Sequence, residues 1–141
     1  MASLVVGDLH FQERDPTLYL AFIQRVENLL SENTYKQVIL LGDIQHKFKV
    51  VDRAAQTLVC LLFSMITKYC NLVVLVGNHD YDNASQFLTE NHTLIPFKTW
   101  PKVKIIDKPT KIKNYHFVHI FPNGQFVEPL GLLKTTYKCI K

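Results

Sequence analysis

Three stretches of this sequence decide the fold, namely Ser3-Leu-Val-Val-Gly-Asp8, Gln37-Val-Ile-Leu-Leu-Gly-Asp43 and Asn71-Leu-Val-Val-Leu-Val-Gly-Asn78. Each begins with a short apolar run rich in β-branched residues, which is too short for a helix and typical of a buried strand. Each run then ends in glycine followed by a residue with a carboxylate or amide side chain. We therefore expect buried strands at residues 3–6, 37–41 and 71–76, each closing on a polar group.

Between these runs, apolar residues recur at helical spacing. Asp15-Pro16 has the form of a helix N-cap followed by proline at the first helical position, so we expect a helix over residues 16–31. A second amphipathic segment runs from about Asp52 to Tyr69. Strands that alternate with helices predict an α/β fold, here a βαβαβ unit with a parallel sheet and right-handed crossovers.

The remainder of the chain has a different character. Asn83 is placed to cap a short helix through Glu90, and prolines interrupt the region that follows. Residues 102–107 and 114–121 have the pattern of short strands. We expect one domain over residues 1–141, with a βαβαβ half that carries the metal site at 1–82 and the start of a second sheet at 83–141.

Composition excludes several classes of protein. The chain is 48% hydrophobic and 20% charged, as in a globular domain, and no apolar run approaches the roughly 20 residues of a membrane span. The first residues lack the basic segment of a signal peptide, and the three cysteines lack the spacing of a disulfide framework or zinc site. We expect an intracellular, cytoplasmic protein with no membrane partner.

Charge is spread unevenly along the chain. Residues 1–97 hold seven Lys and Arg against ten Asp and Glu, whereas residues 98–141 hold nine Lys against two acidic residues. A basic region of this kind either attracts phosphate-bearing polymers or forms a solvated lysine-rich surface. Charge alone does not decide between the two.

The polar groups at the strand ends belong together chemically. Because ligands bind outside the carboxyl ends of parallel strands, we expect these groups to share one rim of the sheet. They are Asp8, His10, Asp43, Asn78 and His79. Carboxylate, imidazole and amide ligands suit Mn, Fe or Zn and are poor for copper or iron–sulfur centres. Two such ions can activate a water and hold a phosphoryl group, while a nearby imidazole protonates the leaving oxygen.

The ordered set Gly-Asp-x-His, Gly-Asp-x-x-His and Gly-Asn-His-Asp, within residues 7–80, resembles the calcineurin-like metallophosphoesterase superfamily. The resemblance implies an α/β/β/α sandwich with two divalent metal ions between its sheets, Mn first among them and Fe, Zn or Mg as alternatives. It implies that Asp8 and His10 bind the first metal, that Asp43 bridges both and that Asn78 binds the second. It also implies that His79 is the catalytic histidine and that Asp80 orients its ring.

The second block favours one branch of that superfamily. Phosphatases typically carry Gly-Asp-x-x-Asp-Arg-Gly, whereas this chain has His46-Lys47. A histidine there is similar to the Mre11/SbcD nucleases and to phage or large-DNA-virus phosphoesterases, in which it approaches the nucleotide. We therefore expect a phosphodiester substrate, DNA or a nucleotide, with His46 in a catalytic role. Lys47 and Lys49 are candidates for contacts to its phosphates, or else are solvated loop lysines.

The family pattern also contains a lone downstream histidine and a Gly-His-x-His block, and neither is evident here. After residue 80 the histidines are His92, His116 and His119, none of them preceded by glycine, and we expect His92 to be exposed. The chain is thus similar to the amino-terminal half of the domain, and a second polypeptide that completes the site is a candidate partner. Two alternatives stay open. One is a catalytically inactive remnant that binds nucleic acid or a protein through residues 98–141, and the other is a purely structural α/β domain.

Overall fold

The computed structural model describes residues 1–12, 14–46, 51–83, 89–112 and 115–117. Its centre is a parallel four-stranded sheet in which β1 (Ala2–Val6), β2 (Tyr35–Leu40), β3 (Asn71–Leu75) and β4 (Val103–Ile106) lie in that order. The first three strands occupy the three apolar runs, within two residues at each end. The α/β class and the βαβαβ unit expected from the sequence are confirmed.

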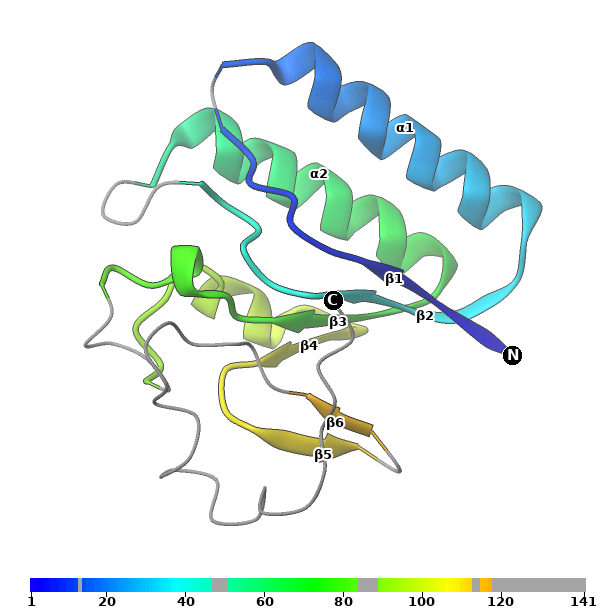
Figure 1. Cartoon of the computed structure of the whole chain (residues 1–141). Coiled ribbons are helices and arrows are strands. Elements are labelled where there is room, and N and C mark those ends of the chain that lie inside the picture. Colours follow the sequence, from blue (N-terminus) through cyan, green and yellow to red (C-terminus); the bar gives the residue numbers. More distant parts are fainter. Residues whose placement is uncertain (13, 47–50, 84–88, 113–114, 118–141) are drawn as a thin grey trace.

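Two helices connect these strands, α1 (Pro16–Glu32) and α2 (Arg53–Tyr69). Asp15 caps α1 by accepting a hydrogen bond from the backbone N of Leu18 at 3.0 Å, and Asp52 caps α2 through Ala54 N at 2.8 Å. Because the strands lie in chain order and their crossovers are right-handed, both helices fall on the same face of the sheet (Figure 1). Within the described part of the chain, no helix is long and apolar enough to cross a bilayer.

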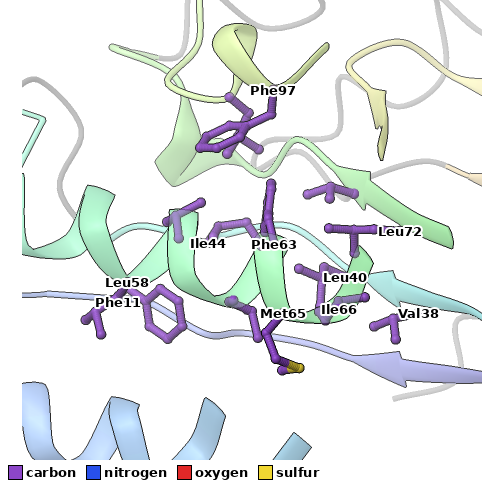
Figure 2. Close-up of a cluster of buried hydrophobic side chains, with 14 of the residues drawn as sticks. Phe11, Val38, Leu40, Ile44, Leu58, Phe63, Met65, Ile66, Leu72 and Phe97 are labelled. Atoms are coloured by element: carbon purple, nitrogen blue, oxygen red, sulfur yellow. The ribbon is translucent and has the colours of Figure 1, made fainter. Parts of the chain in front are cut away.

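The main core lies between the helices and the sheet. Figure 2 shows one face of α2 meeting the inward-facing side chains of β2 and β3. The fully buried members include Val38, Leu40, Leu62, Phe63, Ile66 and Leu72. Alternate strand residues point the other way and form a smaller buried cluster of Ile39, Val73, Leu75 and Ile106. Burial on both faces explains why β2 and β3 read as continuous apolar runs. The expectation that the strand at residues 3–6 is also buried is wrong, because β1 lies at the edge of the sheet and none of its residues is buried.

The strand expected at residues 102–107 is present as β4, but it belongs to the first sheet and not to a second one. We expected it to open a second sheet, but β4 pairs in parallel with β3, with Leu75 opposite Ile106. Burial gives the reason. Val103 and Ile105 pack against the core on the helix side, while Ile106 joins the cluster on the opposite face. A strand with apolar residues on both faces is stabilised by joining a sheet that is covered on both faces.

The rest of the described chain consists of short elements. The connection from β3 to β4 contains two 3₁₀ turns, η1 (Asn78–Asp80) and η3 (Ile95–Thr99). After β4, the antiparallel hairpin of β5 (Thr110–Ile112) and β6 (Tyr115–Phe117) lies on the side of the sheet away from the helices (Figure 1). Most of the helix expected at 83–90, and of the strand expected at 114–121, lies outside the described residues.

Candidate metal centre

The loops that follow β1 and β2 turn sharply and then pair again. Asp8, His10 and Asp43 have backbone φ of 53°, 46° and 50°, in the left-handed region that side chains other than glycine rarely adopt. The backbone N of His10 donates to the carbonyl of Asp43 at 2.9 Å, and Phe11 N donates to Ile44 O at 2.8 Å. These bonds fix the two loops against each other, beyond the ends of the strands.

The glycines that precede the polar residues differ in what they do. Gly42 has φ of 99°, which lets the chain turn into Asp43. Gly77 has no such φ, but a Cβ there would lie 2.2 Å from both the backbone N and the Oδ1 of Asp43. At Gly7 an added Cβ would meet only the side chain of Leu41, at 3.5 Å. The turn therefore needs glycine at 42, and the close approach of the β3 loop to Asp43 needs it at 77.

Asp80 holds the loops after β2 and β3 together. Its side chain is fully buried; Oδ1 accepts from the backbone N of Ile44 at 3.1 Å and of Gln45 at 3.2 Å, and Oδ2 accepts from Gly77 N at 2.9 Å. Burial raises the pKa of Asp80 to about 7, against the backbone donors, which lower it. The oxygens of Asp80 are thus directed to backbone N–H groups of Ile44 and Gln45 in the loop after β2 and of Gly77 in its own loop, and its role in orienting the ring of His79 stays a prediction.

His79 forms hydrogen bonds with two groups of the loop after β2. Its Nδ1 lies 3.0 Å from the carbonyl oxygen of His46. Because a carbonyl oxygen only accepts, Nδ1 carries a hydrogen and donates it. The backbone N of His79 donates to Asp43 Oδ1 at 3.0 Å. The carboxylate of Asp43 and the ring of His79 are thus fixed in one network.

Two overlapping groups of side chains could bind a metal ion. Asp8, His10 and Asp43 have ligand atoms that all lie within 4.8 Å of one another, and so do His10, His46 and His79. In the first group, Asp8 is exposed, Asp43 is 7% exposed, and His10 Nε2 lies 3.7 Å from Asp8 Oδ1. The Nδ1 atom of His10 is buried and has no hydrogen-bond partner among the described residues. Two carboxylates with an imidazole fit a divalent ion such as Mn²⁺ or Zn²⁺.

Other predicted site residues are placed to differing degrees. Asn78 directly follows Gly77, the residue packed against Asp43, so it lies at the same rim as the first group. Lys47 and Lys49 lie outside the described residues, as does His119. His116 is placed only through its backbone, which pairs with Lys111 in the hairpin.

His92 differs from its prediction. It was expected to be exposed and is only 6% exposed. Its Nδ1 accepts from the backbone N of Leu94 at 3.2 Å, which leaves Nε2 to donate to Asp107 Oδ2 at 3.4 Å. Asp107 also takes a hydrogen bond from Lys98 Nζ at 2.6 Å. The sequence near His92 does not indicate its burial, because its partner carboxylate, Asp107, lies fifteen residues later in the chain, just after β4.

One supporting residue was not recognised as such in the sequence. The hydroxyl of Tyr19, on α1, donates to the carbonyl of His10 at 3.1 Å. Its ring packs edge-on against Phe11, with the ring centroids 5.0 Å apart. In the sequence Tyr19 is one more apolar position on a helix face, and no local signal marks its contact with the loop.

Comparison with known proteins identifies the family. The family model of the calcineurin-like phosphoesterases matches residues 1–137. Two curated proteins are similar over 92% of this chain. "Putative phosphoesterase 244L" of Invertebrate iridescent virus 6 is 35% identical over 135 residues, and "Putative phosphoesterase 078R" of Invertebrate iridescent virus 3 is 31% identical over 136. The chain spans 47% and 39% of the lengths of these two relatives.

A solved structure shows the same fold. The crystal structure of the Pseudomonas putida nuclease MPE superposes with a TM-score of 0.55 and 24% identity, covering 79% of this chain and 50% of that one. The parallel sheet, the covering helices and the three polar strand ends described above agree with the architecture that the sequence resemblance implied. On the family match and the two viral relatives together, the chain belongs to the calcineurin-like phosphoesterase family.

Proposed function

We propose that this chain provides the metal-binding part of a metal-dependent phosphoesterase that hydrolyses phosphodiester bonds. The observation that carries the proposal is the meeting of Asp8, His10 and Asp43 within 4.8 Å, at the carboxyl ends of β1 and β2. Family membership, which implies divalent metal ions, supports it. The two viral relatives, both named as phosphoesterases, support it as well.

Four residues would bind the metal ions in this function. Asp8 and His10 would hold a first divalent ion, Asp43 would serve as a ligand to both ions, and Asn78 would offer its amide oxygen to the second. Mn²⁺ is the ion we favour, ahead of Fe, Zn and Mg. When bound, the ions supply an activated water and neutralise the charge of the phosphoryl group. The hydrogen bond from His79 N holds the carboxylate of Asp43 in place for this role.

His79 serves as the acid for the leaving oxygen. Its Nδ1–H is held by the carbonyl of His46, so the proton available for transfer is the one on Nε2 of the charged ring. The hydrogen bond to the carbonyl fixes the direction in which Nε2 points. Asp80 acts through the loops that it joins and is a positioning residue.

The substrate class rests on the second block of the sequence. His46 stands where phosphatases carry an aspartate, and its exposed ring stacks near the ring of His79, 5.9 Å between centroids and 13° between planes. A base or sugar beside the scissile phosphate would meet this surface, which favours DNA or a nucleotide over a phosphomonoester. The structural neighbour from Pseudomonas putida is a nuclease, which supports the same class. Lys47 and Lys49 are candidates for contacts with flanking phosphates.

A protein that works in this way would act inside a cell, the host cell if it is viral, on a DNA or nucleotide substrate, and a second polypeptide that contributes to the site is a candidate partner. The alternative function is a catalytically inactive remnant that binds nucleic acid or protein. The excess of Lys over acidic residues in residues 98–141 favours that alternative. The experiment below separates the two.

Mn²⁺ binding by calorimetry and hydrolysis of chromogenic esters test the proposal. We expect the chain to bind Mn²⁺, Asp43→Asn to abolish measurable binding, and any turnover to favour bis-p-nitrophenyl phosphate over the monoester. Asp82→Asn is the matched control, because this exposed carboxylate belongs to neither metal-binding group. Turnover by the chain alone should be weak, since the distal histidines of the family pattern are not evident. Unchanged Mn²⁺ binding in Asp43→Asn, or a preference for the monoester, would contradict the proposal.

A further inference from the structure

We propose that His10, His46 and His79 form a second metal site, built only of imidazoles, which selects Zn²⁺ and competes with the Asp8–His10–Asp43 group for His10. The inference does not depend on hydrolysis. It rests on three side chains from three separate loops whose ligand atoms lie within 4.8 Å of one another. Two of these side chains have no metal-binding role in the function proposed above.

The three rings lie close to one another. The ring of His10 lies edge-on to both others, at centroid distances of 5.5 Å to His46 and 4.8 Å to His79. Zn–N bonds of about 2.0–2.1 Å in tetrahedral geometry place ligand nitrogens about 3.4 Å apart. The atoms therefore need to close by about 1.4 Å at most. His46 is exposed and can supply this movement by side-chain rotation.

The hydrogen bonds of the rings suit metal binding. A metal-binding imidazole usually donates its other N–H to a carbonyl or a carboxylate, which fixes the tautomer and the ring orientation. His79 has this arrangement, because its Nδ1–H is held by the carbonyl of His46 at 3.0 Å and the neutral ring then carries its lone pair on Nε2. His10 is only partly exposed, and its buried Nδ1 has no hydrogen-bond partner in the described part of the chain.

Donor chemistry separates the two sites. Imidazole suits Zn, Cu and Ni, whereas carboxylate and water oxygens suit Mn and Mg. The all-imidazole group should therefore prefer Zn²⁺, and the carboxylate group should retain Mn²⁺. Because both groups contain His10, occupation of one weakens the other. Zn²⁺ in the imidazole site would also hold His46 and His79 away from a substrate.

The test compares two variants at exposed positions, where folding is least at risk. His46→Gln removes one imidazole from the new site and keeps the backbone carbonyl that holds His79. Asp8→Asn removes a ligand of the other site, and its side chain is 83% exposed. Zn²⁺ affinity is measured by competition with a chromogenic chelator, Mn²⁺ affinity by electron paramagnetic resonance, and urea unfolding confirms that each variant folds.

We expect His46→Gln to weaken Zn²⁺ binding about 10-fold or more, since even the loss of a supporting partner outside the ligand shell costs that much. Its Mn²⁺ affinity should stay within about twofold, because oxygen donors carry that ion. Asp8→Asn should give the reverse pattern. Equal Zn²⁺ affinity in His46→Gln and the unaltered chain would overturn the inference, as would a larger loss of Zn²⁺ in Asp8→Asn. Failure of the proposed function would appear separately, as Mn²⁺ binding that does not respond to Asp8→Asn or Asp43→Asn.

Discussion

At the scale of single residues, three candidate metal ligands have backbone conformations that are energetically unfavourable for residues with a side chain. Asp8, His10 and Asp43 all have positive φ, and for a residue with a Cβ the left-handed region costs roughly 1–2 kcal/mol. Such strain persists only where the surroundings over-determine it, and here the hydrogen bonds between the two loops do so. The strained loops hold these three side chains together as one metal-binding group, which shares His10 with the group of three histidines.

A pair of substitutions at one position tests this strain. In the absence of metal, His10→Gly should be more stable than His10→Ala by about 1 kcal/mol, because only alanine carries a Cβ at φ 46°. Urea unfolding measures the difference. The same pair at Leu9, where φ is not positive, should show no advantage for glycine. A more stable alanine variant at position 10 would contradict the conformation described.

Gly77 is the residue at which the smallest addition should do the most damage. In Gly77→Ala, the new methyl group would overlap the backbone N and Oδ1 of Asp43, so we expect a loss of about 3 kcal/mol in unfolding free energy and of Mn²⁺ binding. Gly7→Ala is the matched control. Its methyl group meets only the side chain of Leu41 at an ordinary contact distance, so its cost should stay under about 1 kcal/mol. Equal effects of the two changes on stability would refute the close approach at Gly77.

At the scale of elements, the sequence predicted most of what is local. Helix periodicity and the Asp15-Pro16 cap place α1 within one residue of its observed bounds, because both signals lie inside the element. The partner of β4 has no such signal. Three of the four residues of β4 are apolar and they lie on both faces of the strand, a pattern that fits any buried sheet. Only the long-range contacts with β3 decide which sheet the strand joins.

The cap of α1 makes a quantitative prediction. Asp15→Ala removes the acceptor of Leu18 N and a negative charge at the positive end of the helix, which should cost about 1 kcal/mol of unfolding free energy. Glu32→Ala removes a carboxylate at the opposite end of the same helix, where the helix dipole does not favour it, and should have little effect. Chemical denaturation of both variants gives the comparison. A larger loss in Glu32→Ala would rule out this account of the cap.

At the scale of the whole molecule, the sequence predicted that three strand ends meet, because parallel pairing brings carboxyl ends to one edge. It did not predict the partners of single buried polar residues. Asp80 is directed to backbone groups 35 and 36 residues earlier, and His92 to a carboxylate 15 residues later. These distances along the chain carry no periodic signal, so only the assembled fold defines the pairs.

The buried His92 makes stability depend on pH. Burial lowers the pKa of His92 from its ordinary 6.5, more than its partner Asp107 raises it, while Lys98 and Glu90 act in opposite directions nearby. Below pH 6.5 the unfolded chain therefore takes up a proton that His92 in the folded chain resists, so the contribution of His92 to stability falls as the pH drops from 7 towards 5. The raised pKa of Asp80, about 7, makes the contribution of that carboxyl change in the opposite sense over the same range, so the part due to His92 is the difference between the unaltered chain and a His92 variant.

Urea unfolding at pH 5, 6 and 7, with a chelator present, checks this dependence. His92→Gln should reduce the slope of unfolding free energy against pH, although lost contacts lower its stability at every pH. His46→Gln, which removes an exposed imidazole that takes no part in the contacts of His92, should retain the slope. An unchanged slope in His92→Gln would show that another group governs the acid response.

The order of the strands has a consequence for synthesis on the ribosome. Since β1 to β4 lie side by side in the order in which they are translated, each emerging strand finds its template already present at the sheet edge. During synthesis the strands can thus pair one after another in sequence order, and no strand has to be inserted between two that have already paired. The loops of Asp8 and Asp43 come into register first. Gly77 and Asp80 follow and contact the loop of Asp43, so all the residues of the candidate metal centre have emerged from the ribosome before β4 does.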